Sequence, residues 1–212
     1  MGKLIIKRMV LGAVSTNCYI VYREGNKRAL CIDPSDKGTK IYEYMKELGV
    51  ELDTILLTHS HFDHILGVER LLELAKVKMI AGEDERELCE NPELNMSKDI
   101  RRPTTVAPDY FCKDGEILEF KEAQLRCRVL FTPGHTKGSI CFYFEEDKVL
   151  ISGDTLFLES VGRADLPTGS MGQLVRSVKE KLFPLDDDTL VYPGHGDETT
   201  IGHEKKYNPY VG

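Results

Sequence analysis

Apolar and polar positions along the chain form two clusters of strand-like runs. The first cluster holds four short apolar runs, at residues 4–9, 18–23, 29–32 and 54–57. The second holds four more and a late run, at residues 116–120, 125–131, 139–144, 148–151 and 189–192. Short runs bounded by turn residues are typical of β-strands. The pattern therefore predicts a strand-rich α/β chain.

Three segments carry apolar residues at helical spacing. They span residues 40–48, residues 66–75 and a late segment that begins at Ser170, where Gln173 is placed for a capping box. Residues 82–108 are polar with broken helical character, and we expect them to cover one side of a site. Because these helices need sheets to pack on, two sheets face to face with helices outside satisfy the layering.

The bulk composition favours one domain that spans residues 1–212. Hydrophobic residues make up 41% of the chain, which is enough for a full core, and no linker-like stretch divides it. The formal net charge of −7 gives no electrostatic reason to expect a nucleic-acid partner. No apolar run approaches the roughly 18 residues of a membrane span, and the N-terminus lacks signal-peptide features. We therefore expect a cytoplasmic protein with no membrane partner, and the sequence leaves its oligomeric state open.

Six cysteines show neither a CxxC pair nor metal-ligand spacing. Four of them lie inside strand-like runs, where cysteine is usually a small buried hydrophobe. Cys89 and Cys112 lie outside these runs, so we expect them to be more exposed.

Residues 58–64 read Thr-His-Ser-His-Phe-Asp-His and directly follow an apolar strand candidate. His59 and His61 alternate along extended chain, so both imidazoles can point to one side. Asp63 and His64 follow where the chain turns into a helix. Imidazoles packed with a carboxylate suit zinc or a similar first-row ion. A purely structural role is disfavoured, because each buried polar group must be hydrated, hydrogen-bonded or ligated.

One arrangement recurs at three later strand ends: an apolar strand, a tight turn and a side chain of metal-ligand type. His135 follows Thr-Pro-Gly, His195 follows Tyr-Pro-Gly, and Asp154 follows Ser-Gly. Each alone is a weak indication, because Gly-Asp after a strand is usually only a turn. Together with the first motif they predict one set of seven metal ligands: His59, His61, Asp63, His64, His135, Asp154 and His195.

These motifs resemble those of the metallo-β-lactamase-fold hydrolases, and within them the short glyoxalase II-like (hydroxyacylglutathione hydrolase-like) branch. The resemblance extends from Asn17-Cys18-Tyr19 to Asn208-Pro209-Tyr210. It implies an αββα sandwich of two mixed sheets with outer helices. It also implies the metal assignment: His59, His61 and His135 hold one ion, Asp63, His64 and His195 hold a second, and Asp154 bridges the two.

The resemblance implies a dinuclear hydrolase of thioesters, with S-D-lactoylglutathione or a related small acyl thioester as substrate. Two cations at such a site can share one hydroxide and lower the pKa of bound water toward about 7. Asp63 and Asp154 are the catalytic carboxylates in this scheme, and no serine or cysteine nucleophile is required. Zinc is the favoured ion, although iron or manganese also suits imidazole and carboxylate ligands.

The substrate side of the site rests on fewer residues. Arg163 lies on the loop after Asp154, at the place of a lysine that contacts glutathione in full-length glyoxalase II enzymes. We expect Arg163 to hold a substrate carboxylate as a bidentate pair. The alternative is that Arg163 pairs with Asp165 and only fixes the loop. Lys137 and Tyr143 are further candidates for substrate contact.

Two departures from those enzymes bear on the substrate. Phe142 stands where they have an aromatic hydroxyl. Seventeen residues follow His195, so we expect no helical C-terminal domain of the kind that supplies further glutathione contacts. Both departures predict an open site that accepts broader or different thioesters.

Other functions remain open on the sequence alone. A persulfide dioxygenase on the same fold uses a single iron, which by likeness would be held by His59, His135 and Asp154. That family usually carries a cysteine where this chain has Val161. A lactone or β-lactam hydrolase is less favoured, because a β-lactamase is normally secreted and has a different second-metal set. A non-catalytic role requires lost ligands, and none of the seven is lost.

Overall fold

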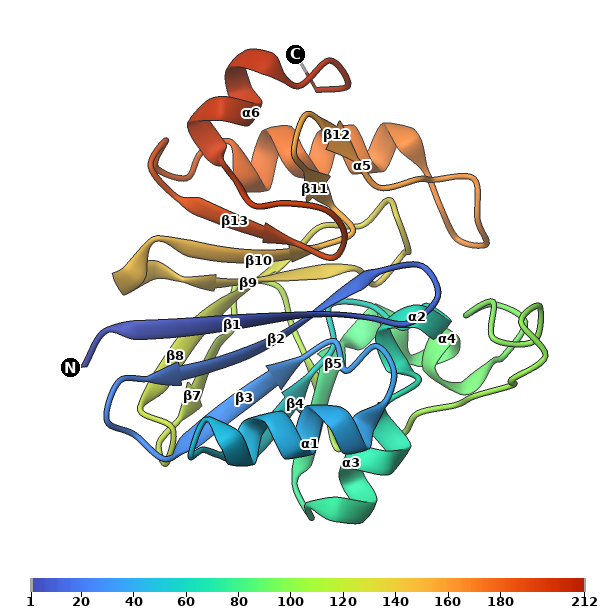
Figure 1. Cartoon of the computed structure of the whole chain (residues 1–212). Coiled ribbons are helices and arrows are strands. Elements are labelled where there is room, and N and C mark those ends of the chain that lie inside the picture. Colours follow the sequence, from blue (N-terminus) through green and yellow to red (C-terminus); the bar gives the residue numbers. More distant parts are fainter. Residues whose placement is uncertain (1, 212) are drawn as a thin grey trace.

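Two six-stranded sheets stacked face to face form the centre of the computed structural model, which describes residues 2–211 (Figure 1). In spatial order, the first sheet contains β1 (Leu4–Leu11), β2 (Thr16–Arg23), β3 (Arg28–Ile32), β4 (Glu51–Leu56), β5 (Lys78–Gly82) and β6 (Tyr110–Cys112). The second contains β14 (Thr199–Thr200), β13 (Leu190–Pro193), β10 (Val149–Gly153), β9 (Ile140–Phe144), β8 (Leu125–Phe131) and β7 (Ile117–Phe120). A separate ribbon pairs β11 (Leu156–Phe157) with β12 (Ser160–Val161).

Both sheets are mixed, as predicted. Strands β1, β2 and β3 are antiparallel to one another, whereas β3, β4, β5 and β6 run parallel. In the second sheet only β10 and β13 are parallel. Because parallel strands end at the same edge of a sheet, the segments that follow them gather at one end of the sandwich.

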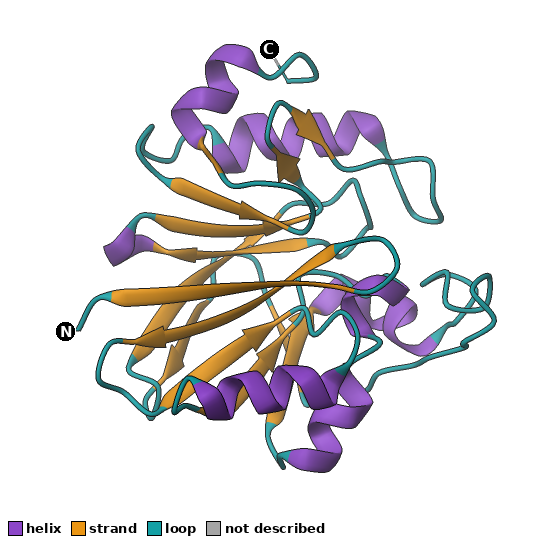
Figure 2. Cartoon of the chain, viewed as in Figure 1, coloured by secondary structure: helices purple, strands orange, loops and turns teal. Residues whose placement is uncertain are grey.

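Helices cover the outer faces of the sheets, so the predicted αββα layering is confirmed (Figure 2). Outside the first sheet lie α1 (Gly38–Glu47), α2 (Phe62–Ile65), α3 (Val68–Leu74) and α4 (Arg86–Glu90). Outside the second lie α5 (Met171–Ser177), which continues as a π-helical turn (Val178–Leu182), and α6 (Ile201–Tyr207). No helix among the residues that the structure describes is long and apolar enough to cross a membrane.

The core consists of three hydrophobic clusters that follow this layering. The central cluster lies between the sheets and includes Tyr19, Phe142 and Phe144, all at most 1% exposed. A second cluster fills the space between the first sheet and its helices, and a third lies between the second sheet and α5. Each large apolar side chain buried in this way stabilises the fold by about 1.5–3 kcal/mol.

Several local predictions differ from the structure. The helix expected over residues 66–75 is observed as α3, which begins only at Val68, and the short helix α2 before it is separated from α3 by Leu66 and Gly67. A Cβ at Gly67 would lie 2.7 Å from the Pro34 carbonyl oxygen, so the loop after β3 packs directly on this break. The predicted capping box is wrong, since the Ser170 side chain makes no capping hydrogen bond. Cys89 and Cys112 are fully buried, so the prediction that they are more exposed is also wrong.

Candidate metal centre

All seven predicted ligands meet at one end of the sandwich. His59 and His61 follow β4, His135 follows β8, Asp154 follows β10 and His195 follows β13. The segments after these strands converge on the right-hand side of the view (Figure 1). Residues separated by more than a hundred positions in the sequence thus lie in one cluster, because their strands end at the same edge.

Three histidines form the first triad: His59, His61 and His135. His135 Nε2 lies 2.8 Å from His61 Nδ1 and 3.2 Å from His59 Nε2. Two ligands bound to one zinc ion at about 2.0–2.1 Å and at the tetrahedral angle would lie about 3.4 Å apart. The first triad therefore needs only a small expansion to hold an ion between its three nitrogens.

The second triad consists of Asp63, His64 and His195. Asp63 Oδ2 lies 3.2 Å from His195 Nε2 and 3.4 Å from His64 Nε2. The Thr16 hydroxyl donates a 2.7 Å hydrogen bond to the same oxygen. These spacings also match two ligand atoms around one ion.

Asp154 lies between the triads. Its Oδ1 is 3.5 Å from His64 Nε2, while its Oδ2 is 3.6 Å from His135 Nε2 and 3.5 Å from His195 Nε2. Gly194 leaves room for this carboxylate, because a Cβ there would lie 2.0 Å from Asp154 Oδ1. One carboxylate thus reaches both triads.

Unsatisfied polar atoms concentrate in the cluster. Five buried side-chain polar atoms of the described residues lack a hydrogen-bond partner, and three of them are His61 Nε2, His64 Nε2 and Asp154 Oδ1. A buried polar atom without a partner is costly, and coordination of a metal ion would remove that cost for His64 Nε2 and Asp154 Oδ1, which both face neighbouring ligand atoms. The donor set is also chemically suited to a divalent first-row metal.

Three of the five histidines have a hydrogen bond at the ring nitrogen that faces away from the other ligands. His59 Nδ1 lies 3.1 Å from Thr58 Oγ1, His64 Nδ1 lies 2.9 Å from Asp33 Oδ2, and His135 Nδ1 lies 2.7 Å from the Arg163 carbonyl oxygen. Such contacts fix the orientation and tautomer of a metal-binding imidazole.

Asp33 is a supporting residue that the sequence prediction missed. It accepts hydrogen bonds from the Thr58 amide (2.8 Å) and the Thr58 hydroxyl (2.6 Å), besides its contact with His64. Asp33 directly follows β3 and precedes Pro34, so it shows the same strand-turn-carboxylate pattern as Asp154. That pattern could have identified it.

Glu85 is a second residue that the sequence prediction missed. Its side chain is fully buried, and it accepts hydrogen bonds from the Ser60 amide (2.8 Å) and the Thr136 hydroxyl (2.7 Å). Ser60 lies between two ligands of the first triad, and Thr136 follows the third. One carboxyl group therefore joins the two loops that carry this triad.

Burial and neighbouring charge give the two triads different electrostatics. Burial, reinforced by neighbouring imidazoles, lowers the pKa of His59, and burial together with His135 lowers the pKa of His61 to about 3. Burial would also lower the pKa of His64, but Asp63, Asp154 and Asp33 outweigh it and raise that pKa to about 10. The second triad thus lies in a negative field that favours a bound cation.

The predicted substrate-binding residues have different surroundings. Arg163 borders the cleft above the ligands. It donates two hydrogen bonds of 2.7 Å to Asp165, which is the pairing that the sequence analysis gave as the alternative to binding a substrate carboxylate. The Lys137 ammonium pairs with Glu87 on α4. Tyr143 is 8% exposed and packs in the cluster beneath α5, on the sheet face opposite Phe142. It does not border this cleft, and its role as a substrate contact stays a prediction.

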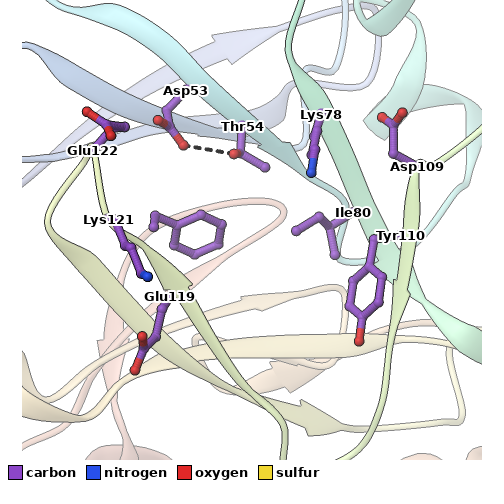
Figure 3. Close-up of a pocket in the computed structure, with 10 residues that line it drawn as sticks. Asp53, Thr54, Lys78, Ile80, Asp109, Tyr110, Glu119, Lys121 and Glu122 are labelled. Atoms are coloured by element: carbon purple, nitrogen blue, oxygen red, sulfur yellow. Dashed lines mark hydrogen bonds between the residues drawn. The ribbon is translucent and has the colours of Figure 1, made fainter.

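A larger groove of about 650 Å³ lies toward the beginnings of β4 and β5, away from the strand ends that carry the ligands (Figure 3). Lys78 and Lys121 border it together with the acidic side chains Asp53, Asp109, Glu119 and Glu122. The charges are mixed, and the potential metal-binding groups of the described residues all belong to the histidine and aspartate cluster. Volume alone therefore does not identify the chemical site.

Comparison with known proteins agrees with the geometry. A model of the metallo-beta-lactamase superfamily matches residues 11–195. The hydroxyacylglutathione hydrolase GloC of Haemophilus influenzae is 36% identical over 203 residues, which cover 94% of each chain. The probable metallo-hydrolase YqgX of Bacillus subtilis is 35% identical over 97% of this chain and 96% of its own.

Two solved structures are similar over almost their whole length. The BLEG-1 B3 metallo-beta-lactamase has a TM-score of 0.92 and 35% identity, covering 98% of this chain and 99% of its own. TTHA1623 in a di-iron-bound form has a TM-score of 0.86 and 33% identity, covering 96% and 99%. The likenesses and the histidine and aspartate cluster support binding of divalent metal ions. The chain therefore belongs to the metallo-beta-lactamase superfamily of metal-dependent hydrolases.

Proposed function

We propose that the protein hydrolyses thioesters, with S-D-lactoylglutathione or a related small acyl thioester as substrate. The observation that carries this proposal is the pair of adjacent triads joined by Asp154. The likeness to a relative named hydroxyacylglutathione hydrolase supports the thioester class. The reaction adds water across the C–S bond and releases a carboxylic acid and a free thiol.

Each triad is proposed to hold one ion: His59, His61 and His135 the first, and Asp63, His64 and His195 the second, with Asp154 shared. The ligand-to-ligand distances support this division. Zinc is the proposed ion, because the sites combine imidazole and carboxylate donors. The similarity to a protein in a di-iron-bound form supports iron as an alternative occupant.

When bound, two divalent ions lower the pKa of a water molecule and stabilise negative charge on the substrate oxygen. Asp63 is proposed to orient that water. Burial would raise the pKa of Asp63, but His64 and the hydrogen bonds from His195 and Thr16 hold it well below its usual range. The carboxylate therefore stays ionised and can accept a hydrogen bond from water in the cleft.

Assays of the metal-replete protein with S-D-lactoylglutathione and with uncharged thioesters test the proposal. We expect hydrolysis of at least one class, lost after chelation and restored by added zinc. Absence of turnover with every thioester would refute it. Oxygen uptake with glutathione persulfide, together with one iron per chain, would instead assign the dioxygenase function.

The likeness to a B3 metallo-beta-lactamase favours β-lactam hydrolysis as a second candidate. The reaction uses the same attack of water on an acyl carbon, with an amide nitrogen as the leaving group. Hydrolysis of a chromogenic cephalosporin with a kcat/KM above that for any thioester would favour this candidate.

A further inference from the structure

The cleft above the ligands is small, and apart from Arg163 the residues that line it besides the ligands are apolar. Its volume is about 180 Å³, whereas pockets for drug-sized ligands span about 300–1,000 Å³. Five of its ten lining residues are the proposed ligands His61, Asp63, His135, Asp154 and His195, and a sixth is Arg163. The remaining four are apolar: Val14, Phe62, Met96 and Leu166. The cleft therefore has room for a small part of a substrate rather than for a whole peptide thiol.

Arg163 is the one positively charged residue of this lining outside the proposed ligands. Its guanidinium is already matched by Asp165, through Nε and Nη2 at 2.7 Å each. Both side chains are exposed, so the pair is accessible to water. A substrate carboxylate would have to compete with Asp165 for the same fork of donors.

Met96 is held over the cleft by a strained backbone. Its φ is +65°, a left-handed conformation that residues with a long side chain rarely adopt. Such strain persists only where the surrounding structure fixes it, and it is common at functional sites. The loop that carries Met96 is therefore a candidate part of the substrate site.

The neighbouring Asn95 supplies that fixation. Its side chain is fully buried and donates to the carbonyl oxygens of Leu88 (3.1 Å) and Thr104 (2.9 Å), while its Oδ1 accepts from the Ser97 amide (3.0 Å). Its own carbonyl oxygen accepts a 2.8 Å hydrogen bond from the Phe62 amide at the start of α2. The position of Met96 is thereby tied to the helix that carries two ligands of the second triad.

We propose that Val14, Phe62, Met96 and Leu166 form an acyl subsite that selects thioesters with a short, uncharged aliphatic acyl group, with Met96 as its main specificity-determining residue. The inference rests on the proposed thioester hydrolysis and names its substrate class. The thiol portion extends toward solvent, since the cleft is too small for it. An acyl hydroxyl gains no polar partner from these four side chains.

A series of acyl thioesters on one uncharged thiol, N-acetylcysteamine, tests the subsite in the metal-replete protein. Acetyl, propionyl, butyryl and lactoyl esters are compared after correction for the rate of hydroxide-catalysed hydrolysis of each. We expect kcat/KM to rise about two- to four-fold for each added methylene, because each is removed from water. We also expect the propionyl ester to exceed the lactoyl ester, which differs from it by one hydroxyl group.

Substitutions of Met96 test whether this residue causes the dependence of kcat/KM on acyl length. Met96→Gln should flatten the dependence of kcat/KM on acyl length. Met96→Gly removes the side chain and relieves the left-handed strain, so it should flatten the dependence without lowering Tm. Ile100→Gln is the matched control, because Ile100 lies in the same loop, is 41% exposed and does not line the cleft. In this variant kcat/KM should still rise with acyl length.

Three outcomes would overturn the subsite while leaving thioester hydrolysis intact. They are a kcat/KM that does not depend on acyl length, a preference for lactoyl over propionyl, and equal effects of the Met96 and Ile100 substitutions. Loss of all thioester turnover in the unmodified protein would instead reject the proposed function itself.

Discussion

The two triads lie side by side, yet they differ in charge and in access to solvent. The first consists of three imidazoles that are at most 3% exposed. The second contains a carboxylate, and its His195 side chain is 28% exposed. A neutral, enclosed ligand set and an anionic, open one therefore meet at Asp154.

Each triad also has its own buried support. Glu85 joins the loops of the first through Ser60 and Thr136, and Asp33 orients His64 in the second. The comparison suggests a division of roles. We expect the first triad to retain an ion more firmly, because its ligands are more buried, and the second to attract a cation by charge.

Asp154→Asn should have the largest effect, because its carboxylate lies within 3.6 Å of ligand atoms of both triads. Removing its charge while keeping its shape should lower kcat by about 10²–10³-fold, the usual loss when an electrostatic element of an active site is removed. Asp63→Asn should lower kcat to a similar extent. Thioester assays with circular dichroism as the folding control measure both effects. Near-normal turnover in either folded variant would contradict a shared dinuclear site.

His61→Ala and His195→Ala test whether the triads differ in retention of their ions. Each should reduce the metal content from two ions to one per chain. The ion that remains in His195→Ala is held by the enclosed first triad, so a chelator should remove it more slowly than the ion that remains in His61→Ala. Elemental analysis and chelator-release rates measure this. Equal release rates would remove the distinction between the triads.

Much of the metal centre is predictable because each ligand is encoded locally. A strand, a turn and a ligand-type residue recur at His135, Asp154 and His195, and the strands then bring the ligands together. Asp33 follows the same pattern and could have been found. Glu85 could not, because it lies in the run Glu-Asp-Glu-Arg-Glu, which is typical of an exposed helix start. Its burial depends on the docking of two distant loops.

The fold class was also predictable, while its shorter elements were not. β5 and β6 are absent from the sequence-based prediction. Both strands are stabilised by pairing with neighbours that are remote in sequence. The strain at Met96 is likewise invisible in sequence, because it follows from the hydrogen bonds of Asn95.

Glu85→Gln tests the support of the first triad through pH. Burial raises the pKa of Glu85 to about 7 from an ordinary value of 4.5. The folded state therefore holds a proton that the unfolded state releases, so this residue's contribution to stability falls as pH rises from about 4.5 to 7. Glutamine does not titrate. The free energy of unfolding of the variant should therefore rise, relative to that of the original protein, by up to about 3 kcal/mol between pH 4.5 and pH 7.

Urea unfolding of metal-free protein at pH 5 and pH 8 measures this difference. Glu90→Gln is the control, since Glu90 is exposed at the end of α4, the helix that directly follows Glu85, and should show no pH-dependent gain. If the two proteins differ in free energy of unfolding by the same amount at both pH values, Glu85 is ionised throughout this range. Burial then does not raise its pKa.

The smallest effect is expected at Arg163, whose carbonyl oxygen contacts His135 of the first triad. The sequence predicted a substrate carboxylate as its partner, but Asp165 already occupies the guanidinium. The Asp165 carboxyl has its pKa lowered to about 2 by this arginine, so the pair persists at neutral pH. The Arg163 carbonyl oxygen, which accepts from His135, is retained in any substitution. Arg163→Gln should therefore raise KM by less than about three-fold, equally for glutathione and N-acetylcysteamine thioesters, because exposed ion pairs are weak. A KM increase of ten-fold or more confined to the glutathione ester would restore Arg163 as a carboxylate-binding residue.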